Sequence, residues 1–375
     1  MNKILVKPVE NRKQLQQFIN LEWQINKNDP CWVPHLLVDR QKILDKKKNP
    51  FYQHAEAEFF LAYKNGQVSG RIAAITNSRH NEFHQDNLGF FGFLEGINDS
   101  DVFKALLDTA QNWVKQKGKN EIIGPMNPST NDEIGFLVDG FNTPPFFMMT
   151  HNPPYYNRQM EQLKYEKIRD VYAYYSDRTS IIISDKLKRI VKATQDKLNI
   201  KLRIVNMADF DAELDRIRKI YNNAWARNWG FVPMTPAEFD FIANDFKKII
   251  DPNLVLIAEI NNQPVGFSLA LPNYNEVFAK IPDGKLFPTG WLKFLFNRKK
   301  IKTIRVITLG VTDKYQQSGI GGIFYLETFE RGIAAGYEAA EFSWVLEDND
   351  LMNRAAKLLG GKLYKTYRIY GKQIS

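Results

Sequence analysis

The stretch that decides the fold is IRVITLGVTDKYQQSGIGG, residues 304–322, in which a strand-forming run leads into a glycine-rich turn. Residues 304–311 are mostly apolar or β-branched, which favours a buried strand. Gly319, Gly321 and Gly322 follow, and the segment 323–335 behind them has the composition of a helix. Backbone N–H groups at a helix start have no partner inside the helix and lie at the positive end of its dipole. The stretch therefore predicts a strand, an anion-binding turn and a helix in succession.

The order of residues in this turn is more specific than its glycine content. Gln316-x-x-Gly319-x-Gly321 comes five residues after Val311, the expected strand end. It resembles the acetyl-CoA loop of the GNAT superfamily of N-acetyltransferases, whose pattern is Q/R-x-x-G-x-G/A. Over about residues 200–375 the resemblance is supported by this motif. Over residues 1–175 it rests on the order of the elements and on the repeat. A tight strand-to-helix turn without a ligand is the alternative.

The resemblance implies a set of contacts with acetyl-CoA or another acyl-CoA. The loop from Gln316 to Gly322 would hold the pyrophosphate, and the strand end would pair with the pantetheine arm in a gap of the sheet. The N–H of Val311 would bind the thioester carbonyl and its developing oxyanion. The implied cofactor-binding residues are Leu309, Gly310, Val311, Gln316, Gln317, Ser318, Gly319, Ile320, Gly321, Gly322, Asn349 and Asn353. For the two asparagines, capping of a short helix is the alternative role.

The chain repeats itself around this stretch. Residues 61–70, LAYKNGQVSG, resemble residues 257–266, IAEINNQPVG, at an offset of 257 − 61 = 196. Each is an apolar run, a polar turn and a second apolar run, and Asn-Gly and Asn-Asn suit the positive φ angles of a hairpin turn. The pair Asn157 and Tyr174 recurs at the same offset as Asn353 and Tyr370. Matches that keep one order and one offset indicate a duplication rather than chance.

The repeat predicts the domain organisation. We expect an α/β fold (α+β, with mixed sheets) made of two tandem GNAT-like acyl-CoA N-acyltransferase modules. The predicted domains are a degenerate module over residues 1–178, a linking helix over 179–199 and a module with the acyl-CoA loop over 200–375. In the second module the predicted helices are 212–225, 236–250, 322–335 and 351–359, and the predicted strands are 254–260, 265–271, 303–311 and 339–345.

The first module departs from the cofactor pattern. Its corresponding segment, residues 90–101, ends in LEGINDSD (residues 94–101) and contains no Q-x-x-G-x-G. Glu95, Asp99 and Asp101 would repel a pyrophosphate. We expect this module to bind no acyl-CoA.

The candidate catalytic residues are Val311, Glu341 and Tyr367. Amine acylation needs a proton acceptor and a proton for the departing thiolate. Glu341, on the strand after the loop helix, is the candidate base. The family's usual acid, a tyrosine seven residues after an asparagine, is missing here, and Tyr364, Tyr367 and Tyr370 are nearby substitutes. The alternatives are a solvated carboxylate and tyrosines that only pack.

Two segments are expected to bind the acceptor, a small-molecule amine, in a cleft between the modules. One is the long polar segment 125–154 of the first module, since long irregular insertions are often functional. The other is the loop between the first two helices of the second module, where the family places acceptor contacts. The candidate substrate-binding residues are Trp225, Asn228, Trp229, Phe231, Asn131 and His151. The alternative is that both segments seal an interface between the modules.

Composition restricts the other possibilities. The chain has 375 residues, one cysteine (Cys31) and a formal net charge of +9. No metal-ligand spacing is present, and no apolar run approaches the roughly 20 residues of a membrane span. We therefore expect a cytoplasmic protein without a metal and without stable membrane insertion. The charge suits RNA, anionic lipid or a polyphosphate cofactor, but no RNA motif is visible, so a nucleic-acid partner is not expected.

The leading hypothesis is an acyltransferase that uses acetyl-CoA or a longer acyl-CoA on a small amine or amino acid. Two other hypotheses remain open. The missing tyrosine favours a non-catalytic acyl-CoA-binding or scaffold protein of the same fold, and the basic charge alone suggests a nucleic-acid-binding protein. The amphipathic, basic stretch 286–300 could touch an anionic membrane, hold an acyl chain or cover its own sheet.

Overall fold

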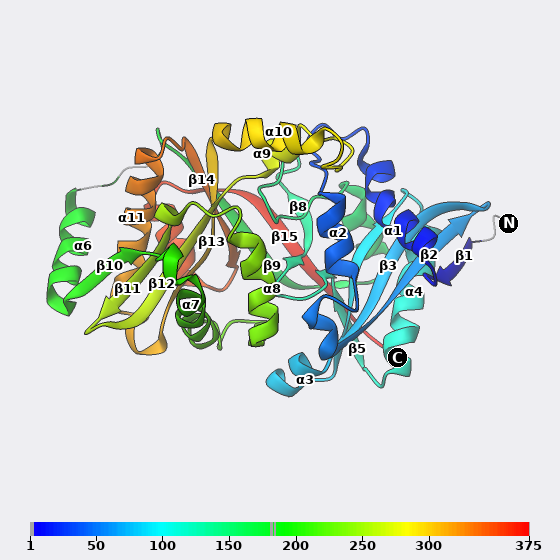
Figure 1. The fold of residues 1–375 in the computed structure, drawn as a ribbon. Coiled ribbons are helices and arrows are strands. Elements are labelled where there is room, and N and C mark those ends of the chain that lie inside the picture. The colour runs from blue at the N-terminus through cyan, green and yellow to red at the C-terminus, as the bar shows by residue number, and fades with distance from the viewer. Residues whose placement is uncertain (1–3, 181–182, 184, 375) are drawn as a thin grey trace. The chain divides into compact units, whose positions relative to one another are not determined.

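The computed structural model describes residues 4–180, 183 and 185–374, which form two compact units (Figure 1). Unit 1 comprises Met1–Val171, Asn275–Asn297 and Lys365–Ser375, and unit 2 comprises Tyr172–Tyr274 and Arg298–Tyr364. Residues 1–3, 181, 182, 184 and 375 fall within the predicted domain ranges but lie outside the described residues.

The elements are those of two α/β modules. The helices of unit 1 are α1 (Arg12–Asn26), α2 (Leu37–Leu44), α3 (Ser78–His84), α4 (Ser100–Gln116), α5 (Tyr155–Gln162), α9 (Asn275–Phe278) and α10 (Gly290–Asn297). Its strands are β1 (Ile4–Pro8), β2 (Ala55–Lys64), β3 (Gln67–Asn77), β4 (Leu88–Gly96), β5 (Glu121–Gly124), β6 (Met126–Asn127), β7 (Glu133–Ile134) and β8 (Phe136–Asp139). Unit 2 contains α6 (Asp185–Leu198), α7 (Phe210–Ala224), α8 (Pro236–Phe246), α11 (Ile320–Ala334), α12 (Asp350–Leu358), β10 (Ile200–Ile204), β11 (Val255–Ile260), β12 (Gln263–Pro272), β13 (Thr303–Val311) and β14 (Ala339–Leu346). The strands β9 (Glu166–Asp177) and β15 (Lys362–Gln373) contribute residues to both units.

In unit 1 the strands follow the order β1-β2-β3-β4-β5-β15, and β4 and β5 are parallel. Side chains alternate between the two faces, so one face packs against α4 and the other against α1. Ile72 and Phe91 share a buried cluster with Leu106 of α4. On the opposite face, the ring of Phe18 from α1 lies 5.4 Å from that of Phe59. The sheet of unit 1 is thus buried between helices.

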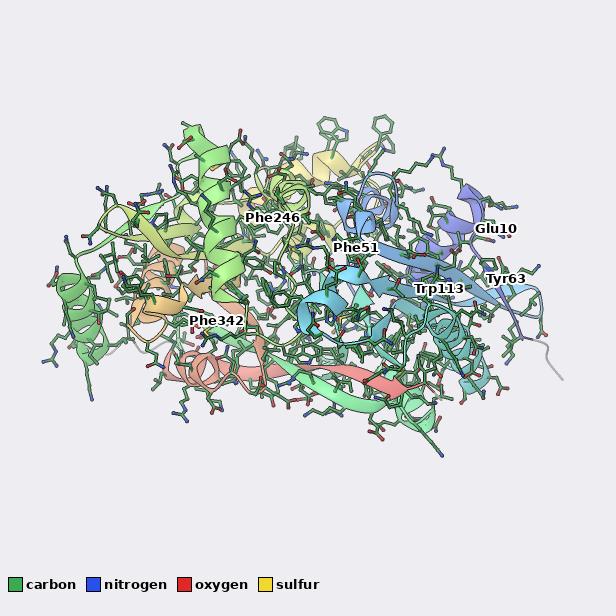
Figure 2. All side chains as sticks on the ribbon, turned by 90° about the horizontal axis from the view of Figure 1, so that it is seen from below. Glu10, Phe51, Tyr63, Trp113, Phe246 and Phe342 are labelled. Atoms are coloured by element: carbon green, nitrogen blue, oxygen red, sulfur yellow. The ribbon has the colours of Figure 1, made fainter. Side chains whose placement is uncertain are left out.

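Unit 2 has the same layers. Its strands follow the order β9-β14-β13-β12-β11-β10, with β13 and β14 parallel. Phe324 of α11 packs against Leu256 on one face, and Ile220 of α7 packs against Ile257 on the other. Phe342 of β14, labelled in Figure 2, lies on the α11 side, with its ring 5.7 Å from that of Tyr325.

The two halves share backbone detail at the hairpins that the sequence repeat predicts. Both hairpin turns use positive φ, with 52° at Asn65 in the first and 52° at Asn261 in the second. Both hairpins also shift register at the same place, between Ala62 and Tyr63 and between Ala258 and Glu259, again 196 residues apart. The prediction of two tandem modules in an α/β fold therefore holds.

The compact units differ from the contiguous domains expected from the sequence, because the final strands are shared. Strands β9 and β15 are 12 residues each, and the end of each belongs to the other half's unit. Accordingly, Tyr370 donates to Asn157 within unit 1 at 3.2 Å, and Tyr174 donates to Asn353 within unit 2 at 2.8 Å. The same tyrosine-to-asparagine hydrogen bond thus occurs in both units, and each time it joins a residue of one sequence half to a residue of the other half. Residues 275–297, an insertion in the second half, also belong to unit 1, and the expected linking helix becomes α6 of unit 2.

Two kinds of feature are absent from the described residues. Within residues 4–180, 183 and 185–374, no helix is both long and apolar enough to cross a bilayer. The same residues contain no group of His, Cys, Asp or Glu arranged to hold a metal ion.

Candidate active site

The sheet of unit 2 splits beside the glycine-rich turn. Among the described residues, strand β13 pairs with β14 from Thr303 to Val306 only, and beyond Val306 it pairs with β12 alone. A Cβ on Gly266 would lie 2.9 Å from the carbonyl oxygen of Gly310, so Gly310 directs its backbone groups toward β12. Because successive residues of a strand direct N–H and C=O to opposite edges, Leu309 and Val311 direct theirs into the gap. These are the residues expected to pair with an extended ligand.

The turn itself exposes a helix start. Gly319 has φ of +89°, a conformation that favours glycine, and its carbonyl accepts from the N–H of Gly322 at 3.0 Å. Among the described residues no side chain caps α11. A Cβ on Gly321 would meet the Leu309 side chain at 3.9 Å, an ordinary van der Waals contact. The N-terminus of α11 therefore combines N–H donors with a positive dipole end, as an anion site requires.

Contacts with the end of α7 hold the turn in place. The side-chain amide of Gln316 donates to the Ala224 carbonyl at 3.4 Å and to Asp313 at 3.0 Å. The N–H of Asp313 donates to Asn223 at 2.9 Å, and the Ser318 hydroxyl donates to the Tyr315 carbonyl at 2.6 Å. Gln316, the first residue of the motif, thus positions the loop through its side chain.

Glu341 lies near the vertex of the gap, one residue before β14 leaves β13. It is fully buried, 3.7 Å from Arg305 Nε, and accepts from the Ser343 hydroxyl at 2.5 Å. Its other oxygen accepts a hydrogen bond from Tyr364. The structure therefore places the candidate base in an ion pair with two hydroxyl donors.

The tyrosine for which the structure gives a hydrogen bond to Glu341 is Tyr364. Tyr367 belongs to unit 1 and is fully buried there, whereas Val311 and Glu341 belong to unit 2. Tyr364, three residues earlier on β15, contacts Glu341 and is only partly buried. Side chains alternate between the two faces of a strand. Which of them faces a carboxylate that is distant in sequence depends on the strand register, and the sequence leaves that register open.

The two asparagines of α12 make structural hydrogen bonds. Asn349 caps the helix by accepting from the N–H of Met352 at 3.2 Å. Asn353 donates to the carbonyls of Leu346 and Glu347 at 3.0 Å and 3.2 Å while accepting from Tyr174. Both side chains thus hold the start of α12 in place at the end of β14.

The expected acceptor residues of the second half gather beside β13. Trp225 stacks on Tyr221 with ring centroids 4.8 Å apart, and Phe231 lies 5.5 Å from Tyr221. A Cβ on Gly310 would lie 2.0 Å from the Trp225 ring, so only glycine fits beneath it. The N–H of Asn228 donates to the Trp225 carbonyl at 2.8 Å, and Trp229 follows in the same turn. An aromatic wall thus stands on the α7 face of β13, next to the residues that face the gap.

The expected acceptor residues of the first half lie in unit 1, which contains a polar pocket of its own. The pocket has about 610 Å³ of space not filled by atoms, part of it open to solvent. Its lining includes Glu22, Trp32, His35, Arg40, Arg71, Phe93, Glu95, Asn127, Glu133, Phe136, Met149 and His151. His151 Nε2 donates a hydrogen bond to the Asp29 carboxylate at 2.8 Å, and Asn131 lies in the turn that precedes β7. Sequence reasoning selected His151 from this pocket but missed the acidic and basic residues around it.

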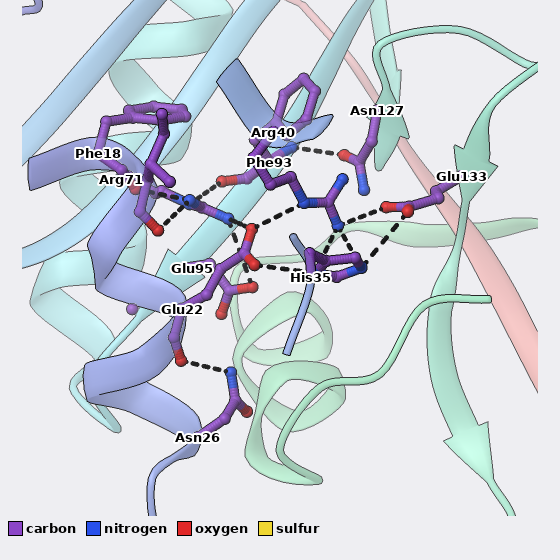
Figure 3. Close-up of polar contacts among 12 residues, drawn as sticks. Phe18, Glu22, Asn26, His35, Arg40, Arg71, Phe93, Glu95, Asn127 and Glu133 are labelled. Atoms are coloured by element: carbon purple, nitrogen blue, oxygen red, sulfur yellow. Dashed lines mark hydrogen bonds and ion pairs between the residues drawn. The ribbon is translucent and has the colours of Figure 1, made fainter. Parts of the chain in front are cut away.

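Figure 3 shows these charged residues as one network. Arg40 pairs with Glu133 at 2.8 Å and lies 3.4 Å from Glu22. Arg71 pairs with Glu22 and lies 3.8 Å from Glu95, while its Nε donates to the Phe93 carbonyl at 3.1 Å. The two arginines and Glu22 are each less than a tenth exposed. Removing one partner from such a network leaves a buried charge uncompensated.

The network divides its carboxylates into two classes. Burial acts to raise the pKa of Glu22, but the charges of Arg40, Arg71 and His35 hold it well below its usual value. Burial likewise opposes ionisation of Glu133, and Arg40 and His35 lower its pKa to about 2. For Glu95, burial and the nearby Glu22 charge outweigh Arg71 and raise the pKa to about 7. Glu95 is thus the carboxyl of this network that exchanges a proton near neutral pH.

Comparisons with known proteins identify the family. No family model matches the chain. Protein YghO of Escherichia coli K12 is 38% identical over 376 residues, which cover 99% of this chain and 95% of the relative. A bacterial ceramide synthase of Caulobacter vibrioides is 37% identical over 374 residues, 98% of this chain and 97% of the relative.

Solved structures show the fold. A tandem GNAT protein from the clavulanic acid biosynthesis pathway superposes with a TM-score of 0.57 over 100% of this chain and 99% of that chain, at 10% identity. A probable N-acyltransferase from Enterococcus faecalis V583 gives a TM-score of 0.55 over 100% of this chain and 73% of that chain, at 9% identity. The chain therefore belongs to the family that contains Protein YghO and the bacterial ceramide synthase, and it has the tandem GNAT fold.

Proposed function

We propose that the protein is an acyl-CoA-dependent N-acyltransferase whose cosubstrate binds to unit 2. The observation that carries the proposal is the glycine-rich start of α11, which has no side-chain cap among the described residues and lies directly beside the gap between β13 and β14. Such a helix start suits the pyrophosphate of coenzyme A. The backbone groups of Leu309 and Val311 suit the amides of the pantetheine arm, as an added strand would.

The chemistry follows from the direction of the gap. An arm that enters at the loop and runs back along β13 carries its thioester toward the vertex, where Glu341 lies. There the amine nitrogen attacks the thioester carbon, the C–N bond forms and the C–S bond breaks. We assign to Tyr364 the relay that gives a proton to the departing thiolate and takes one from the acylated nitrogen. Glu341 orients its hydroxyl. A backbone N–H that β13 directs into the gap would stabilise the oxyanion.

The acceptor is the amine of a long-chain amino alcohol in this proposal. One relative that aligns over almost the whole chain is a bacterial ceramide synthase. A ceramide is the fatty amide of such an amino alcohol, and its formation is an N-acylation. This favours a long-chain acyl-CoA and a lipid amine over acetyl-CoA and a small polar amine. The aromatic wall of Trp225 and Phe231 would contact the hydrocarbon part of these substrates.

The test is a turnover assay with purified full-length protein. Release of free thiol is followed with palmitoyl-CoA or acetyl-CoA, together with sphinganine or ethanolamine, and the product is identified by mass spectrometry. We expect the amide of sphinganine and palmitate to form fastest. N-acetylsphinganine, which lacks the free amine, is the matched control and should release no thiol. Tight binding of palmitoyl-CoA with no turnover across a panel of amines would replace the proposal with the non-catalytic acyl-CoA-binding protein.

A further inference from the structure

An exposed apolar surface lies on α10 and the segment before it. Five large apolar side chains there face solvent, with exposed fractions of 81% for Phe287, 70% for Phe296, 46% for Trp291, 45% for Leu295 and 38% for Leu292. Aromatic side chains stand clear of the ribbon beside α10 in Figure 2. We call these five residues the α10 surface. The sequence left open whether this segment covers its own sheet, and these exposures exclude that role for them.

The segment is held firmly to unit 1. The indole N–H of Trp23 donates to the Pro282 carbonyl at 2.9 Å, and the N–H of Leu37 donates to the Gly284 carbonyl at 2.9 Å. Asn275, at the start of α9, donates to the Pro145 carbonyl at 2.8 Å. The segment thus has fixed anchors on α1, on α2 and on the 125–154 insertion.

The helix has two distinct sides. Phe294 turns inward, with its ring 6.5 Å from that of Phe278. Trp291 and Leu295 are four residues apart, as are Leu292 and Phe296, so each pair occupies one stripe of the outer side. The Trp291 indole N–H donates to the Pro288 carbonyl at 2.9 Å. With its N–H satisfied internally, this indole can enter an apolar medium at low cost.

Basic residues accompany the apolar ones along this segment of the sequence. Residues 283–300 contain five basic residues and a single acidic one, Asp283. Lys285, Lys293 and the consecutive Arg298, Lys299 and Lys300 are all exposed. Apolar and aromatic side chains on one side of a helix, flanked by lysine and arginine, are typical of a helix that lies in the interface of an anionic bilayer. A partner protein would need no such concentration of positive charge.

We propose that the α10 surface docks the protein on an anionic lipid bilayer. The rings and leucines enter the interfacial region, and the basic residues contact phosphate headgroups. The protein would then be peripheral, bound by adsorption rather than by a spanning segment. This inference stands apart from the proposed catalysis, because adsorption requires neither acyl-CoA nor acceptor.

The test is co-sedimentation of purified full-length protein with vesicles, in the absence of any substrate. We expect binding to vesicles of phosphatidylcholine and phosphatidylglycerol in equal parts at low salt. Binding to phosphatidylcholine alone should be weaker by about tenfold or more, and 0.5 M salt should weaken binding to the mixed vesicles, since surface charge attraction is screened. No binding to the mixed vesicles at low salt would overturn the proposal.

Variants locate the surface. The triple variant Phe287→Ser, Trp291→Ser, Phe296→Ser should lose binding by about tenfold or more. The matched control Leu351→Ser, Leu358→Ser removes side chains of α12 that are 64% and 79% exposed, and it should bind like the unchanged protein. Thermal unfolding and coenzyme A binding confirm that each variant is folded. Equal vesicle binding by the triple variant would refute the assignment. So would a concentration-dependent dimer, seen by sedimentation velocity, that the triple variant loses while vesicles bind neither protein.

Discussion

One backbone position has opposite surroundings in the two modules. In unit 1 the N–H of Gly96 donates to the Tyr156 hydroxyl at 3.0 Å, and its carbonyl accepts from the Tyr155 hydroxyl at 2.7 Å. The matching residue of unit 2 is Val311, since each pairs with the corresponding glycine of the preceding hairpin. At an offset of 196, Leu351 and Met352 replace the two tyrosines and carry no hydroxyl. In unit 1 the two tyrosines thus bond to the backbone of Gly96, whereas in unit 2 the backbone of the matching residue Val311 faces the gap between β13 and β14.

The helix starts show the same contrast. In unit 1 the Asp99 carboxylate accepts from the N–H groups of Asp101 and Val102, and it also pairs with Lys64. The N–H of Phe93 donates to the Asn127 side chain at 2.6 Å. A side chain thus also occupies the place in unit 1 that corresponds to the beginning of the gap in unit 2. In unit 2 the helix starts at Gly319 without a side-chain cap among the described residues. In unit 1, side chains thus bond to backbone groups at the positions where we propose that unit 2 binds its ligand.

The largest expected effect tests the contrast between helix starts. Gly321→Trp should weaken binding of palmitoyl-CoA by about 1,000-fold, because the indole fills the space in front of the N–H donors. The equivalent change at the second residue of α4, Asp101→Trp, is the matched control and should leave binding unchanged. Isothermal titration calorimetry gives both values. Binding that withstands Gly321→Trp would show that the ligand lies elsewhere.

A second prediction concerns the vertex of the gap. Tyr364→Phe should lower kcat for amide formation by about 100-fold with little change in KM, since it removes a proton donor and keeps the ring. Tyr367→Phe, in unit 1, is the control and should retain kcat. The ratio of the two kcat values is measured with saturating substrates. If Tyr364→Phe keeps full kcat, the thiolate leaves without this hydroxyl.

The smallest expected effect concerns stability. Glu95 has a folded-state pKa of about 7, above its ordinary value of 4.5, so the folded state binds its proton more tightly. Its contribution to stability is greatest below its ordinary pKa and is lost as the pH rises through 7. Glu95→Gln, which keeps a neutral side chain at every pH, should therefore gain stability over the unchanged protein on going from pH 5 to pH 8, by about 2 kcal/mol.

Urea unfolding of both proteins at the two pH values measures this gain. The charged neighbours Glu22, Arg71 and Arg40 are present in both proteins, so their own titrations cancel to first order in the difference. A difference that stays constant between pH 5 and pH 8 would mean that Glu95 ionises normally.

Local patterns of the sequence predicted most of the fold. The turn residues Asn65 and Asn261 and the helix start at Pro236 have local chemistry that determines their conformation, and each has the expected structure. The exchange of β9 and β15 between units was not predictable, because both strands have the same pattern and either unit could accept either end. Strand partners are set by long-range packing, which a local pattern does not encode.

The candidate site was predictable where it depends on backbone. The glycines of the loop and the strand before it identify the anion-binding helix start without knowledge of distant contacts. The side-chain chemistry was harder, because the contact between Glu341 and Tyr364 joins residues 23 positions apart. The charge network of unit 1 joins Glu22, Arg71 and Glu133, which lie on separate elements. Only the folded chain brings such residues together.

Hydrogen–deuterium exchange of the full-length protein, with and without palmitoyl-CoA, tests most directly where the cosubstrate binds. Peptides that cover residues 309–323 of unit 2 should become protected, because their N–H groups would bind the ligand. The matching peptides of unit 1, residues 93–103, should exchange at the same rate in both samples. Protection of the unit 1 peptides, or no protection in either module, would contradict the assignment of the acyl-CoA site to the second module.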